Sequence, residues 1–378
     1  MSIAHHSSAL LTPSQPLYSR PLHSWAEPPR RPAKPLEPTL SDTHRTPLLG
    51  QLYTQMARIR AFENAAEILS QGGVSAYNKT ADGSAKVRGP LHLSTGQEAV
   101  AVGVCAHLRA SDYLTSTHRG HGHTLAKGAD LTRMMGELYG KANGFNGGKG
   151  GSMHIADFSV GMLGANGVVA AGLPIATGAA HAQKLQGRDD ITVCFFGDGA
   201  INRGPFLESL NWAQVHQLPV LFVCEDNRWS ATTASGPMIA GGGASARSES
   251  LGIPATTVDG NDVLAVHDAA QALVVGLRAG SGPRLLHALT YRIKGHVSVD
   301  LAAYRDPAEL AAALKTEPLG HARARYLAMG GSSAELDAID AAAAAEVALA
   351  MQTADAAPWP EPSGAFTDIQ TTGDGQWY

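Results

Sequence analysis

Apolar residues change their spacing along this 378-residue chain, and the spacing predicts where helices and strands form. From Leu49 they recur at intervals of three and four, through Leu52, Met56 and Ile59, which is typical of a helix. A second apolar helix is predicted over 97–108. Short apolar runs then alternate with helical patterns. The runs cover 191–196, 220–224, 255–258 and 285–291, and the clearest helices between them cover 205–217 and 263–277.

This alternation of strands and helices predicts an α/β fold. The runs at 191–196 (ITVCFF) and 220–224 (VLFVC) are apolar throughout, as strands buried on both faces of a parallel sheet are. Because a helical pattern follows each strand, consecutive strands are expected to run parallel. We therefore expect a doubly wound parallel sheet flanked by helices.

Composition divides the chain into three parts. Residues 1–47 hold nine of the 21 prolines and show no helical or strand period, which predicts an extended or disordered arm. Residues 48–306 form the expected α/β domain, in which the glycine clusters of 118–172 are typical of a binding surface. Residues 307–378 are expected to form a C-terminal helical region and tail, with an alanine-rich helix over 307–355.

Charge and cysteine content narrow the possible classes of protein. The 29 Lys and Arg residues against 33 Asp and Glu give a net charge of −4, so nothing suggests a nucleic acid or an anionic membrane as partner. The longest uncharged stretch, 158–183, is interrupted by glycine, asparagine and proline, which fits a buried loop leading into a helix and not a membrane span. The three cysteines form no CxxC pair, which favours a reducing, cytoplasmic compartment.

Polar residues follow two neighbouring strands at the edge where a parallel sheet binds its ligands. Gly197-Asp198-Gly199 comes directly after the first strand, and Asn227 follows the second, one crossover later. Paired strands lie about 4.8 Å apart, so Asp198 and Asn227 can reach one cation. A carboxylate and an amide suit Mg²⁺, which would complete its shell with a backbone carbonyl, water and the oxygens of a phosphorylated ligand. The helix that follows would offer its N-terminal N–H groups to that phosphate.

This motif resembles the thiamine diphosphate site of thiamine-dependent enzymes. Residues 49–304 resemble the α subunit of the decarboxylating component of 2-oxo acid and acetoin dehydrogenase complexes, and the acetoin branch most. Six stretches in family order carry the resemblance: RIRAFE (58–63), HLSTGQEAVAVGV (92–104), STHRGHGHTLAKG (116–128), GGKGGSMHIAD (147–157), LGANGVVAAG (163–172) and YRIKGHVSVDLAAYR (291–305).

The resemblance implies a role for each matching position. Mg²⁺ would be held by Asp198, Asn227 and the backbone carbonyl of Trp229. The diphosphate would be contacted by Gly199, Ala200, His118 and Arg119, and the aminopyrimidine by the backbones of Gly167 and Val169. Two histidines would be catalytic: His296 near the diphosphate and the reaction centre, and His92 facing the substrate carbonyl or carboxylate.

The resemblance also implies partners and a reaction. A β subunit would supply the half of the site that holds the pyrimidine, in a heterotetramer of two α and two β chains. The reaction would cleave the bond next to a carbonyl, in acetoin or in a 2-oxo acid such as pyruvate or a branched-chain acid. The acyl unit would pass to a lipoyl-bearing acyltransferase.

Three positions and one loop depart from the family pattern, and one of the positions is Trp229, where the family usually has tyrosine. Asp226 stands where the family commonly has asparagine, so an extra carboxylate lies near the cation site. Val297 replaces the serine that mitochondrial pyruvate dehydrogenase phosphorylates, so that switch is absent at this position. The loop over 73–89 is longer than usual, and we expect its residues to shape substrate entry or a subunit contact.

Simpler readings of the same residues stay open. Asp198 could only cap the following helix, Arg119 could form a surface ion pair, and His92 and His296 could be ordinary buried histidines. His118, His121 and His123 have a spacing that zinc ligands also show, and 147–151 (GGKGG) could be a plain linker. Two other functions remain: a nicotinamide-dependent oxidoreductase, although 197–204 (GDGAINRG) lacks the GxGxxG fingerprint, and a catalytically idle scaffold subunit.

Overall fold

The computed structural model describes residues 43–73 and 82–367. Most of the predicted arm, 1–47, lies outside these residues, and so do residues 74–81 of the 73–89 loop. Within the described part, Thr43–Arg45 forms a short 3₁₀ helix and α1 spans Thr46–Leu69. Helix α1 begins before the expected Leu49 because Pro47 lies in its first turn, where a proline costs no hydrogen bond.

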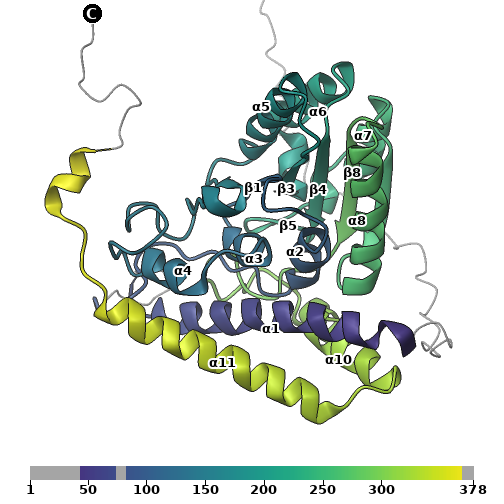
Figure 1. Cartoon of the computed structure of the whole chain (residues 1–378). Coiled ribbons are helices and arrows are strands. Elements are labelled where there is room, and N and C mark those ends of the chain that lie inside the picture. Colours follow the sequence, from purple (N-terminus) through teal and green to yellow (C-terminus); the bar gives the residue numbers. More distant parts are fainter. Residues whose placement is uncertain (1–42, 74–81, 368–378) are drawn as a thin grey trace, which may run out of the picture. The chain divides into compact units, whose positions relative to one another are not determined.

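Six parallel strands form the central sheet, in the order β2-β1-β3-β4-β8-β7 (Figure 1). Their bounds are β1 Tyr113–Ser116, β2 Met162–Ala165, β3 Thr192–Gly197, β4 Val220–Asp226, β7 Ala255–Asp259 and β8 Arg284–Leu289. This confirms the doubly wound parallel sheet. A two-stranded antiparallel sheet, β5 Trp229–Ser230 with β6 Thr233–Ala234, follows β4.

Helices cover both faces of the sheet, and alternate residues of each strand face opposite layers. Val193 and Phe195 of β3 pack into a core shared with helices α1, α2 and α8, whereas Cys194 and Phe196 pack against α5 and α6. The bounds of the helices up to α8 are α2 Glu98–Cys105, α3 Gly120–Ala126, α4 Leu131–Leu138, α5 Gly172–Leu185, α6 Gly204–Val215, α7 Gly243–Ser250 and α8 Val263–Arg278. Short 3₁₀ helices cover Phe158–Val160, Asp198–Asn202, Gly236–Met238 and Pro362–Phe366.

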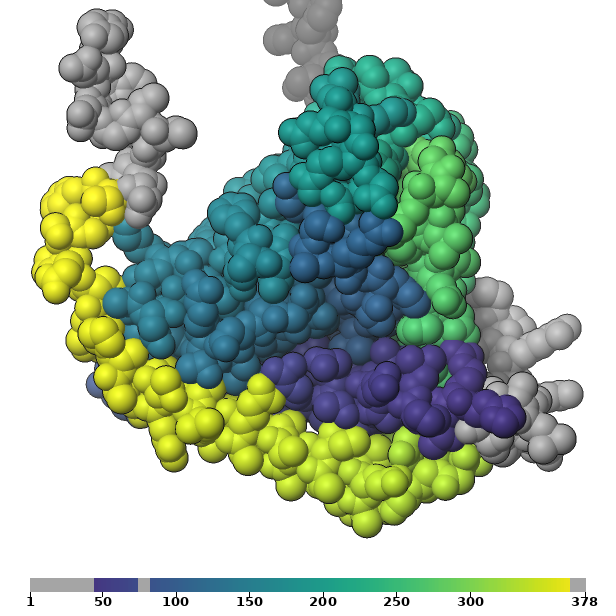
Figure 2. Space-filling model, in the orientation of Figure 1, coloured from purple at the N-terminus to yellow at the C-terminus, as the bar shows by residue number. Residues whose placement is uncertain are grey.

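The C-terminal region forms three helices, whereas the sequence predicts one alanine-rich helix over 307–355. They are α9 Pro307–Leu314, α10 Pro318–Ala328 and α11 Ser333–Ala356. Pro318 starts a new helix, and Gly330 ends α10 with a left-handed φ of 86°. Helix α11 packs along α1 and α4, and its side chains (yellow) lie against those of α1 (purple) in Figure 2.

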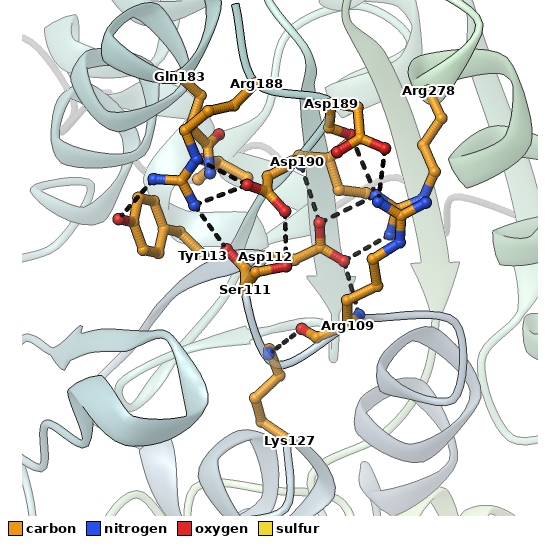
Figure 3. Close-up of polar contacts among 12 residues, drawn as sticks. Arg109, Ser111, Asp112, Tyr113, Lys127, Gln183, Arg188, Asp189, Asp190 and Arg278 are labelled. Atoms are coloured by element: carbon orange, nitrogen blue, oxygen red, sulfur yellow. Dashed lines mark hydrogen bonds and ion pairs between the residues drawn. The ribbon is translucent and has the colours of Figure 1, made fainter. Parts of the chain in front are cut away.

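A polar cluster ties the amino ends of the strands together, opposite the edge where a ligand is expected (Figure 3). Asp112, directly before β1, is fully buried and accepts hydrogen bonds from Arg278 at the end of α8 and from the backbone of Ile191 before β3. The cluster continues to the surface, where Arg109 pairs with Asp189 at 2.7 Å.

Among the described helices, none has both the length and the apolar run needed to cross a bilayer.

Candidate functional site

A cavity lies at the carboxyl ends of β1, β3 and β4. Strand β1 has β2 on one side and β3 on the other, so the strand order reverses here, which is where open α/β sheets bind ligands. The cavity is lined by every residue that the sequence analysis assigned to the site: His92, His118, Arg119, Gly167, Val169, Asp198, Gly199, Ala200, Asn227, Trp229 and His296. The fold thus brings together residues from segments far apart in the chain.

Asp198 carries a carboxylate oxygen that needs a partner. The register of β3 with β4 pairs Gly197 with Glu225, so the turns that follow, with Asp198 and Asn227, are neighbours. Asp198 is 2% exposed, and its Oδ2 has no hydrogen-bond partner within the described residues. Burial raises the pKa of Asp198 to about 6, and the charge of Asp226 adds to this, whereas a hydrogen bond with Ser235 lowers it. An orphaned, buried oxygen of this kind fits a cation ligand.

Two hydrogen bonds fix the Asn227 amide beside it. Nδ2 of Asn227 donates to Oε1 of Gln97 at 2.9 Å, and Oδ1 accepts from the backbone N–H of Trp229 at 3.1 Å. An amide oxygen has two lone pairs, so Oδ1 can also coordinate a cation. Gln97 lies within the stretch 92–104, but its sequence context predicts no role for it. A carboxylate oxygen and an amide oxygen are ligands that Mg²⁺ prefers.

The turn after β3 leaves no room for a side chain at Gly199. A Cβ there would lie 2.9 Å from Cβ of Ser230, because β5 packs directly over the turn. The turn itself is the short 3₁₀ helix Asp198–Asn202, and α6 begins only at Gly204. Asp198 therefore does not cap α6, whose N-cap is Arg203. Capping alone does not explain the carboxylate.

Two buried guanidinium groups give the cavity a positive wall. Arg119 is 3% exposed and donates to the backbone oxygens of Leu93 at 2.7 Å and His296 at 2.8 Å. Arg292 is 1% exposed and donates to the backbone oxygen of Ala231 at 2.8 Å. Burial, with the charge of Arg292, lowers the pKa of Arg119 to about 9. Arg119 is thus no surface ion-pair residue, and buried cations bonded to carbonyls suit an anionic ligand.

Three histidines gather around these cations. The ring centroid of His92 lies 4.7 Å from that of His118 and 4.8 Å from that of His296. Burial, followed by the charge of Arg119, lowers their pKa values to about 3 for His92, about 2 for His118 and about 4 for His296. All three rings are therefore neutral at pH 7, and each offers one donor and one acceptor without charge.

The other two histidines of the HxxHxH stretch point elsewhere. Nδ1 of His121 lies 2.7 Å from Oε1 of Glu63, and Nδ1 of His123 lies 2.7 Å from Oγ of Ser116. The ring of His123 also stacks on Phe195, with 3.9 Å between centroids. Among the described residues, the histidines of this stretch do not converge on one metal. The zinc reading of the spacing is therefore wrong.

Asp226, which departs from the family pattern, has a partner of its own. Its Oδ2 lies 2.9 Å from Nε2 of His287, and it is the next residue after Glu225 on β4.

Arg292 and Ser230 also line the cavity, although the sequence predicts no role for them. Arg292 could have been found, because it directly follows the apolar run predicted over 285–291, which overlaps β8. Ser230 carries no local sequence signal.

Comparison with known proteins identifies the family. Residues 78–363 match the sequence model of a protein family described as "Dehydrogenase E1 component". The α subunit of acetoin:2,6-dichlorophenolindophenol oxidoreductase from Bacillus subtilis (strain 168) is 41% identical over 319 residues, covering 84% of this chain and 92% of the relative. The subunit of the same name from Cupriavidus necator is 42% identical over 321 residues, with the same two coverages.

A relative that is named for another substrate matches over the same share of the chain. The α subunit of the pyruvate dehydrogenase E1 component from Rhizobium meliloti is 37% identical over 321 residues, covering 84% of this chain and 88% of the relative. These matches confirm the resemblance that the six sequence stretches indicated. The chain therefore belongs to the dehydrogenase E1 component family, as an α subunit of the acetoin and pyruvate type.

Proposed function

We propose that this α subunit binds thiamine diphosphate and Mg²⁺ in the cavity at the carboxyl ends of β1, β3 and β4. The observation that carries the proposal is the unpartnered Oδ2 of Asp198, buried beside the fixed amide of Asn227. Two buried guanidinium groups on the same cavity supply the positive charge that a diphosphate needs. The residues present therefore fit the cofactor that the family uses.

Each site residue that the sequence predicts has a role in this proposal. Asp198, Asn227 and the carbonyl of Trp229 hold Mg²⁺; His118, Arg119, Gly199 and Ala200 hold the diphosphate; the backbones of Gly167 and Val169 hold the aminopyrimidine. Bound there, the thiazolium supplies the electron sink for cleaving a bond next to a carbonyl. His296 and His92 keep their catalytic roles as neutral rings near the reacting carbonyl, where a ring N–H can donate a hydrogen bond to the substrate carbonyl or carboxylate.

The proposed assembly needs further chains. The names of the relatives specify α subunits, which supports a β subunit as partner. We place two α and two β chains in a heterotetramer that passes its acyl unit to a lipoyl-bearing acyltransferase. A cytoplasmic location is supported by the three cysteines, which are buried and unpaired.

A substrate panel with the co-expressed α and β chains tests this function. Acetoin, pyruvate and a branched-chain 2-oxo acid are each supplied with an artificial electron acceptor. We expect turnover of acetoin or pyruvate that requires thiamine diphosphate, Mg²⁺ and the β chain together. Turnover that survives without thiamine diphosphate would refute the proposal, and turnover that is unchanged in His296→Ala would favour the idle-scaffold alternative. Fluorescence titration with NADH tests the nicotinamide alternative.

A further inference from the structure

One buried carboxylate organises the glycine-rich loop at 144–151. Glu137, in α4, has no exposed surface, and its two oxygens accept four backbone N–H groups from this loop. The donors are Asn146 (2.8 Å) and Gly148 (3.0 Å) to Oε2, and Gly150 (2.7 Å) and Gly151 (3.0 Å) to Oε1. The GGKGG stretch is therefore no plain linker, because a side chain outside it specifies its conformation.

Two glycines stand where the backbone of the loop passes close to α4 and to the turn that follows it. A Cβ at Gly144 would lie 2.6 Å from Cα of Glu137. A Cβ at Gly148 would lie 2.6 Å from the backbone oxygen of Gly140, and its φ of 79° also favours glycine. The glycines at these two positions and the hydrogen bonds to Glu137 thus specify the same conformation of the loop.

The end of this loop forms part of the cavity wall. Oγ of Ser152 lies 3.0 Å from Nε2 of His121, whose other ring nitrogen Glu63 holds. Met153 lines the cavity, and its Sδ lies 3.9 Å from the position that a Cβ of Gly167 would take. Met153 therefore faces the segment that we assign to the aminopyrimidine.

The C-terminal segment contacts the chain directly before the loop. Lys141 donates to the backbone oxygen of Ala357 at 2.9 Å and lies 4.2 Å from the ring centroid of Trp359. The backbone N–H of Ala142 donates to the oxygen of Pro358 at 3.0 Å. The chain is thus held directly before the loop by the C-terminal segment and within the loop by Glu137.

We propose that Glu137 is a positioning residue of the cofactor site: it fixes loop 144–151 so that Met153 stands in the cavity wall before a ligand enters. A wall held in place costs no ordering entropy when the ligand binds, so loss of the carboxylate weakens binding. This inference rests on the proposed function for its ligand, but the loop's rigidity is independent of it.

Glu137→Gln tests the proposal, because it keeps the size of the side chain but replaces one acceptor with an N–H₂ group that faces backbone donors. In the αβ assembly, we expect faster amide hydrogen exchange over 144–154 and unchanged exchange in α8. We also expect the dissociation constant for thiamine diphosphate with Mg²⁺ to rise about tenfold, with kcat at saturating cofactor within about twofold of wild type. Glu346→Gln, the same change in a partly exposed ion pair with Arg58, is the matched control.

Met153→Ala tests whether Glu137 acts through Met153. We expect a similar loss of cofactor affinity, and no further loss in the double variant, because the two changes remove one contact. Unchanged exchange in Glu137→Gln would overturn the proposal, and so would faster exchange with unchanged affinity, or additive losses in the double variant. If wild type itself binds no thiamine diphosphate, the proposed function fails, while the exchange data still report on the loop.

Discussion

Arg119 donates to the backbone oxygen of His296 at 2.8 Å and also contacts Nδ1 of the same residue at 3.2 Å. A guanidinium has no acceptor, so Nδ1 must accept and the neutral ring carries its proton on Nε2. One cation thereby fixes both the position and the tautomer of the histidine that we place nearest the reaction centre. It also opposes any second positive charge on that ring.

Replacing this cation is expected to change the titration of His296. In Arg119→Gln, the pKa of His296 rises from about 4 toward the ordinary value near 6.5, because a nearby positive charge no longer disfavours the protonated ring. Burial still acts, so the rise is partial. NMR titration of labelled histidine in the αβ assembly measures it. Arg109→Gln, at a surface pair, is the control, and equal His296 pKa values in the two variants would contradict the account.

The depressed pKa of His118 predicts that acid weakens the fold. The unfolded chain binds a proton at this residue below pH 6.5, whereas burial keeps the folded pKa at about 2. Between these values the unfolded state holds more protons, so stability is lost as pH falls below 6.5. In His118→Gln, we expect the free energy of unfolding to fall less steeply, by about 1 kcal/mol per pH unit between pH 6 and pH 5.

Denaturant unfolding at several pH values provides this comparison. The difference between wild type and His118→Gln isolates one group, because the carboxylates titrate equally in both. A variant with the same pH dependence as wild type would show that His118 binds its proton equally well in the folded and the unfolded chain, which would contradict the lowered pKa.

The buried acid at the amino ends of the strands is expected to stabilise the fold without serving the site. Asp112→Asn leaves the guanidinium of Arg278 without its carboxylate and is expected to cost about 3 to 5 kcal/mol of unfolding free energy. Asp189→Asn makes the same change in the same cluster, but its side chain is 74% exposed and its pair is screened by water. We expect its unfolding midpoint to match wild type, and equal midpoints for the two variants would contradict this assignment.

Strands were predictable where their sequence was apolar throughout. β3 and β4 are buried on both faces, so their runs have no polar alternation and stand out. β1 (YLTS) and β2 (MLGA) were not predicted, because each has only four residues. The apolar run is interrupted by threonine and serine in β1 and by glycine in β2. Their place in the sheet depends on neighbours far away in the chain.

The site residues divide in the same way. Asp198 and Asn227 were predictable because each directly follows a recognisable strand, and strand ends meet at one edge of a parallel sheet. Glu137 was not predictable, because its partners are backbone amides of a loop and leave no side-chain pattern in the sequence. Gln97 was missed for a similar reason, since only the folded chain brings it to Asn227, 130 positions away.

The most direct test of the account is calorimetric binding of thiamine diphosphate with Mg²⁺ to the αβ assembly that carries Asp198→Asn. The change keeps the shape of the side chain and removes the one carboxylate that we assign to the cation. We predict a dissociation constant raised by about 100-fold or more over wild type, with Asp189→Asn, the same change at the surface, within about twofold. Equal affinity in wild type and Asp198→Asn would contradict the proposed site.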